Sequence, residues 1–76
     1  MHMENIKTLG EKRVNVDFNV TNDDTVHQIK VKTAELLDLC ETMRDGKGPE
    51  AQRAISIAQT GFEDAAMWAV KSNFIK

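Results

Sequence analysis

The residues with the clearest chemical potential are basic side chains spread along the 76-residue chain. Lys12 and Arg13 precede an alternating segment, and three more cations fall in the first halves of two expected helices: Lys30, Lys32 and Arg53. Cations of this kind bind phosphates, while Phe18 and Asn19 offer an aromatic face for a base and an amide for base edges. Each alone is more often a solvated surface group. The set indicates binding of a compact nucleotide only if the fold brings its members together.

Catalytic and metal-binding motifs are not found in the sequence. It contains no phosphate-binding glycine loop, no His-Glu-x-x-His, no paired cysteines and no serine in an elbow context. His2 and His27 have no partners at metal-ligand spacing, and we expect His27 to be structural. Cys40 falls on an apolar helix face, which favours a role as a small core residue over a reactive thiol. For Trp68, on a helix with surplus apolar surface, an interface role is favoured over stacking on a base. We therefore expect a binding protein rather than an enzyme, with no metal and no cofactor.

Composition restricts the partners and the compartment. Ten basic and twelve acidic residues give a net charge of −2, which disfavours binding to DNA or RNA. No apolar run is long enough to span a membrane, and the first residues lack the pattern of a secretory signal. A single cysteine fits a reducing compartment and excludes an internal disulfide. We expect a cytosolic protein that gains stability by self-association, because so short a chain has a small core.

Hydropathy patterning predicts an all-α protein with an extended N-terminal arm over residues 1–21. Residues 12–20 alternate between apolar and polar side chains, as in an extended segment that pairs with another chain or lies along helices. Residues 21–25 are rich in N-cap types and predict a helix over about 23–44. A turn at 45–48 and Pro49 lead into a second helix over about 49–74. Residues 22–76 should therefore form an antiparallel two-helix hairpin.

Each expected helix carries a seam of apolar or small residues at alternating spacings of three and four. The first seam is Val26, Ile29, Thr33, Leu36, Cys40 and Met43, and the second is Ala51, Ile55, Ala58, Phe62, Ala65 and Ala69. Further apolar residues lie off both seams, more than one hairpin can cover: Leu37, Leu39, Ile57, Trp68, Val70, Phe74 and Ile75. This surplus predicts assembly into a compact homo-oligomer.

The second helix carries a family resemblance. Residues 49–69, PEAQRAISIAQTGFEDAAMWA, resemble the helical-hairpin domain shared by phage anti-CBASS and anti-Thoeris sponge proteins, and residues 63–69 are the most specific part. Phe18 with Asn19 and the segment HQIK at 27–30 extend the resemblance over nearly the whole chain after Gly10. The chain looks most similar to the anti-CBASS branch. That branch implies a hexamer that sequesters cyclic di- and trinucleotide messengers without cleaving them, in the cytoplasm of the infected bacterium.

The resemblance also implies roles for individual residues. Phe18 would stack on a base beside Asn19, and Lys30 takes the place of a phosphate-binding lysine. Arg53 matches a basic position assigned to the phosphates of a cyclic trinucleotide. Some similar proteins carry Tyr where Phe18 stands, so this chain keeps the stacking face and lacks the hydroxyl.

Alternative functions follow from the same features. The hairpin is shared between branches, so a sponge for the cyclic ADP-ribose-type signal of Thoeris is one alternative. A small helical adaptor that binds another protein through Trp68, Phe74 and Ile75 is another. Tight binding of a free cyclic nucleotide would separate the sponge from the adaptor.

Overall fold

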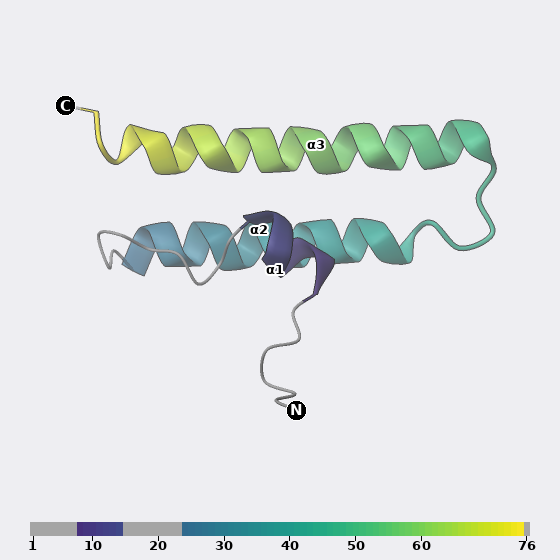
Figure 1. Cartoon of the computed structure of the whole chain (residues 1–76), viewed down its shortest axis with the longest axis horizontal. Helices are drawn as coiled ribbons and strands as arrows, with labels where there is room; N and C mark the ends of the chain where they lie inside the picture. The colour runs from purple at the N-terminus through teal and green to yellow at the C-terminus, as the bar shows by residue number, and fades with distance from the viewer. Residues whose placement is uncertain (1–7, 15–23, 76) are drawn as a thin grey trace.

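The computed structural model describes residues 8–14 and 24–75, and within these ranges the fold is a helical hairpin with a short helix packed against it. Helices α2 (Asp24–Thr42) and α3 (Pro49–Ser72) run antiparallel and side by side (Figure 1). Helix α1 (Leu9–Val14) lies across the middle of α2. The all-helical hairpin predicted from the sequence is therefore confirmed.

Helix α1 corrects part of the predicted extended arm. The arm was expected to be extended from Lys12 onward, yet α1 continues to Val14. Thr8 and Glu11 form a capping box: the Glu11 N–H donates to Thr8 Oγ1 at 3.1 Å, and the Thr8 N–H donates to Glu11 Oε1 at 2.9 Å. These two bonds satisfy the amides of the N-cap residue Thr8 and of Glu11 in the first turn, which favours a helix start at Leu9. The rest of the alternating segment, residues 15–20, lies outside the described residues.

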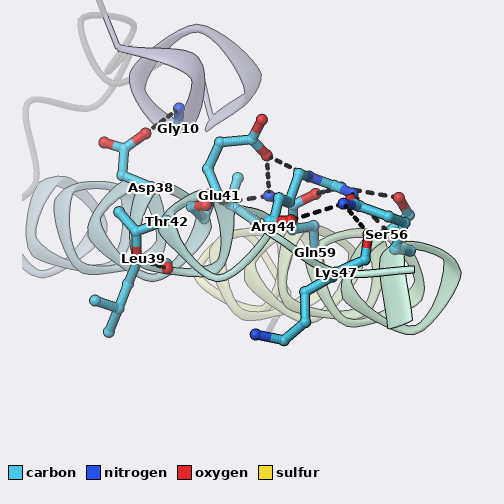
Figure 2. A network of polar contacts seen from close by, with 11 residues as sticks. Gly10, Asp38, Leu39, Glu41, Thr42, Arg44, Lys47, Ser56 and Gln59 are labelled. Carbon is cyan, nitrogen blue, oxygen red and sulfur yellow. Dashed lines mark hydrogen bonds and ion pairs between the residues drawn. The ribbon is translucent and has the colours of Figure 1, made fainter. Parts of the chain in front are cut away.

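Gly10 sets how closely α1 approaches α2. A Cβ atom at this position would overlap the backbone carbonyl of Ala34, so only glycine allows the observed packing. The Gly10 N–H also donates to Asp38 Oδ1 at 2.7 Å, which fixes α1 along the helix beneath it (Figure 2). The short helix is therefore held both by shape and by a hydrogen bond to a carboxylate.

The core agrees with the predicted seams at Val26, Thr33 and Ile55 and departs from them at other positions. Leu37, expected off the seam, is fully buried, whereas Leu36, expected on it, is 42% exposed. The buried residues of α2 are Val26, Lys30, Thr33, Ala34 and Leu37, and those of α3 are Ile55, Gln59 and Ala66. Among the buried residues, the polar Lys30 and Gln59 are two that the apolar pattern does not predict as core positions. Lys30 lies in the core because its four methylene groups are apolar, and Gln59 because its amide is hydrogen-bonded.

The turn between α2 and α3 is closed by Gly46 and organised by Arg44. Gly46 has a positive φ of 74°, the left-handed conformation that commonly ends a helix, and Pro49 begins α3. The Arg44 guanidinium donates to Glu41 Oε1 at 2.9 Å on α2, and it reaches three side chains of α3 (Figure 2). These α3 acceptors lie 2.7–2.8 Å away and are Gln52 Oε1, Ser56 Oγ and Gln59 Oε1.

Gln59 completes this network from the core. It is 1% exposed, and its amide donates to the Leu37 carbonyl at 3.2 Å and to Glu41 Oε1 at 2.8 Å. The hydrogen bonds from Gln59 and Arg44 lower the pKa of the Glu41 carboxyl. One buried amide and one guanidinium therefore tie the two long helices together at the turn.

Large apolar side chains remain exposed on both long helices. Trp68 is 61% exposed, with the Lys71 ammonium 4.9 Å from its ring centroid. Other exposed apolar side chains on or next to α2 and α3 are Leu36, Leu39, Met43, Ile57, Phe62, Met67, Phe74 and Ile75. None of the described helices is long and apolar enough to cross a membrane.

Candidate functional site

A pocket of about 120 Å³ brings together two of the cations predicted to bind phosphate, Arg13 of α1 and Lys30 of α2. The third wall belongs to the second half of α3, which contributes Glu63. The remaining lining residues are mostly apolar: Val14, Ala66, Met67 and Val70. The site therefore combines cationic and apolar walls from all three helices.

Lys30 reaches this pocket from the buried face of α2. The residue is only 8% exposed, so most of its side chain packs within the hairpin. A lysine held in this way contributes a charge in a partly desolvated setting, where an anion is attracted more strongly than in water. Lys30 therefore occupies a core position of α2, although it is not a member of the predicted apolar seam.

Arg13 is fixed at the pocket by an ion pair with α3. Its Nη2 donates to Glu63 Oε1 at 2.9 Å and its Nε donates to Glu63 Oε2 at 3.3 Å, a side-on fork. Both side chains are about a quarter exposed. The hydrogen-bonded Glu63 carboxylate raises the pKa of Arg13. The pair also joins α1 to α3, which are 50 residues apart at these positions.

The other predicted ligand residues do not lie at this pocket or cannot be placed. Lys12 is exposed on α1 and does not line the pocket. Arg53 lines a separate, open depression of about 290 Å³ with Ser56, Ile57 and Thr60. Phe18 and Asn19 lie outside the described residues. The structure thus brings Arg13 together with Lys30 and leaves Arg53 on a different surface of α3.

Glu63 and the pocket's apolar residues were not predicted as site residues. Nothing in the local sequence pairs Glu63 with Arg13, because that contact depends on how α1 sits across the hairpin. The sequence does hold a local signal for α1: Thr8 followed by Glu11 is a capping-box pattern that predicts a helix start before Arg13.

Residues weighed as possible catalytic or ligand groups lie elsewhere. His27 is exposed, and Cys40 is half-buried with a free thiol. Within residues 8–14 and 24–75, no group of three or more His, Cys, Asp or Glu side chains is placed to hold a metal ion. Among these residues, the cations around the pocket and on α3 are the chemical groups most suited to a charged ligand.

Comparison with known proteins fits this arrangement. The protein-family model described as Acb2/Tad1, hairpin domain, matches residues 11–74. The chain belongs to this family. It is the family of anti-CBASS and anti-Thoeris sponges, so the resemblance seen in the sequence is confirmed. Its members bind cyclic-nucleotide signals as anti-defence sponges. Searches of curated proteins and of solved structures find no match.

Proposed function

We propose that this protein sequesters the cyclic di- and trinucleotide messengers of CBASS immunity, without cleaving them, in the cytoplasm of a phage-infected bacterium. The observation that carries the proposal is the convergence of Arg13 and Lys30 on one pocket with apolar walls. Two cations can bind one phosphate group, and the apolar wall can contact the edge of a ribose or a base. Family membership supplies the ligand class, cyclic-nucleotide signals.

The size of the pocket supports binding by an oligomer. Sites that enclose a drug-sized ligand measure roughly 300–1,000 Å³, whereas this pocket measures about 120 Å³. It can hold a phosphate with its neighbouring atoms, so the bases of a cyclic dinucleotide must contact further groups. Phe18 and Asn19 are the candidates within the chain, and a second copy is the candidate outside it. The exposed apolar residues, including Trp68, support a homo-oligomer, which we propose is a hexamer.

Sequestration rather than hydrolysis is supported by the ionisable groups at the pocket. These are Arg13, Lys30 and Glu63. Both carboxylate oxygens of Glu63 accept hydrogen bonds from Arg13, so this acid is held as an ion-pair partner rather than as a base aimed at a ligand. Ligand recovered after heat denaturation of the complex should therefore be chemically intact, as judged by chromatography. Linear dinucleotide or mononucleotides would contradict the proposal.

The test of binding is a calorimetric titration with a panel of cyclic di- and trinucleotides. Lys30→Met should lower affinity strongly, because it removes the ammonium while nearly keeping the volume that the core requires. Lys32→Met is the matched control, since Lys32 is exposed on the same helix and does not line the pocket. Equal affinity in the two variants would exclude Lys30 from the site. No binding of any panel member by the unsubstituted protein would refute the proposal.

A second ligand class is favoured by the family model itself, which covers the anti-Thoeris as well as the anti-CBASS sponges. The second candidate function is therefore a sponge for the cyclic ADP-ribose-type signal of Thoeris. The same titration separates the two when that signal is added to the panel. Competition between the signal and a cyclic dinucleotide would show whether they share the pocket of Arg13 and Lys30.

A further inference from the structure

The ion pair at the pocket uses only one of the two edges by which a guanidinium binds an oxyanion. Arg13 meets Glu63 through Nε and Nη2, the side-on edge. The other edge, formed by Nη1 and Nη2, presents two parallel N–H groups and is equally suited to a bidentate phosphate contact. A carboxylate held on the side-on edge therefore fixes the direction in which the end-on edge points.

From this geometry we infer that Glu63 is a positioning residue for ligand binding: it orients Arg13 so that the end-on edge of the guanidinium grips a phosphate of the cyclic nucleotide. The inference rests on the proposed function, because it assigns a role within the same pocket. Glu63 itself repels the ligand's charge, so its contribution acts through Arg13 and not through direct contact.

The need for such a residue follows from where Arg13 is attached. It lies next to the last residue of a six-residue helix, and an arginine has four rotatable side-chain bonds beyond Cα. Without a partner on α3, the guanidinium would sample many positions, and ordering it on binding would reduce affinity. The fork to Glu63 removes that freedom before the ligand arrives. It also ties α1 to α3, so the wall that includes Val14 keeps its place beside the pocket.

An opposite role is conceivable on electrostatic grounds, and the structure argues against it. A carboxylate near a phosphate site could act as an internal competitor that the ligand must displace. Competition requires that the ligand and the carboxylate use the same edge of the Arg13 guanidinium. Glu63 occupies the side-on edge, and the end-on edge is directed away from it. Glu63 is also 29% exposed, so water and salt screen its repulsion of the ligand.

The two roles predict effects of opposite sign. If Glu63 positions Arg13, Glu63→Ala should weaken binding of the tightest cyclic dinucleotide by roughly 3- to 10-fold, the range expected when one long side chain must be ordered on binding. Glu63→Gln should restore part of the loss, because its amide oxygen still accepts one hydrogen bond from Arg13. Asp64→Ala is the control for net charge, since Asp64 is the adjacent acid on α3, is exposed and does not line the pocket.

A double-mutant cycle tests whether the effect passes through Arg13. Arg13→Lys keeps the positive charge and removes the second edge, so adding Glu63→Ala to it should change affinity less than twofold. Light scattering and circular dichroism on each variant check that assembly and helix content are unchanged.

Each result of these titrations decides between the roles. A rise in affinity for Glu63→Ala would overturn the inference and identify a competitor, and unchanged affinity would overturn it as well. An equal loss with Arg13 and with Lys at position 13 would mean that Glu63 acts independently of the guanidinium edge, which also contradicts it. If the unsubstituted protein binds no cyclic nucleotide, the proposed function fails and this inference fails with it, whereas binding that is insensitive to Glu63 refutes the inference alone.

Discussion

Arg44 should be the most important polar side chain for the stability of the hairpin. Replacing it by Ala removes the donor that joins Glu41 of α2 to Gln52, Ser56 and Gln59 of α3. The largest consequence falls on Gln59, because its Oε1 lies in the core and accepts from Arg44 at 2.7 Å. An acceptor that loses its partner in the core costs about 1–3 kcal/mol.

The contacts with Gln52 and Ser56 are more exposed and add less. Hydrogen bonds of this kind each contribute about 0.5–1.5 kcal/mol to stability, and the loss is smaller where water can bind the exposed partner instead. Arg44→Ala should therefore lower the free energy of unfolding by about 2–4 kcal/mol, given these ranges. Arg44→Lys should recover little of it, because one ammonium cannot span acceptors that the planar guanidinium reaches together.

The measurement is urea unfolding followed by circular dichroism at one fixed protein concentration, so that self-association contributes equally to every variant. Lys47→Ala is the matched control. It removes a cation from the same turn but keeps the backbone carbonyl that accepts from Gln52. A substitution of this exposed residue should change stability by less than about 0.5 kcal/mol. If Arg44→Ala and Lys47→Ala unfold at the same urea concentration with the same slope, the network does not stabilise the hairpin as argued.

Four further outcomes follow from the same structure. Gly10→Ala should detach α1 from α2, because the added methyl group would overlap the Ala34 carbonyl. Hydrogen exchange at the amides of α1 should then be faster, and unchanged protection would contradict this prediction. The pKa of Glu41 is lowered in the folded protein, so its stabilising effect is present above its ordinary pKa of 4.5 and is lost as pH falls through the folded value. The urea concentration at the unfolding midpoint should therefore fall on acidification, and it should fall less steeply for Glu41→Gln than for the unsubstituted protein. An equal pH dependence in the two proteins would exclude this role of Glu41. In a calorimetric titration, Arg53→Ala should weaken the binding of cyclic trinucleotides and leave the affinity for cyclic dinucleotides nearly unchanged, because Arg53 lies away from the pocket of Lys30. Equal losses of affinity for both ligand classes would indicate one shared site. Light scattering should report an oligomer, and a monomer of 8.6 kDa would contradict the role given to the exposed apolar residues.

The positions of the long helices could be predicted because they depend on local chemistry. The relevant sequence signals are the N-cap residue types before Asp24, Gly46 in the turn and Pro49 at the start of α3, and each concerns only a few neighbouring residues. The family could also be recognised from the second helix, and the family model confirms it over residues 11–74. Helix α1 has a local signal of the same kind in Thr8 and Glu11, and the alternating residues that overlap its last turn favour an extended segment instead.

The register of the core could not be read from hydropathy alone. Seams through Leu36 or through Leu37 have equally good spacing, and the choice depends on whether Lys30 and Gln59 can occupy core positions. A glutamine is tolerated in a core only when its amide finds partners, and here those partners are Arg44, Glu41 and the Leu37 carbonyl. These groups come from the facing helix or the turn, so the decision belongs to the tertiary structure.

The sequence by itself determined the types of group available for the site: cations suited to phosphates, without a catalytic motif. Only the tertiary structure decided that Arg13 and Lys30 meet at one pocket, that Arg53 lies elsewhere and that Glu63 holds Arg13. The physical reason is that helix propensity and capping act over a few residues, whereas a salt bridge across 50 residues exists only after Gly10 has allowed α1 to pack closely against α2.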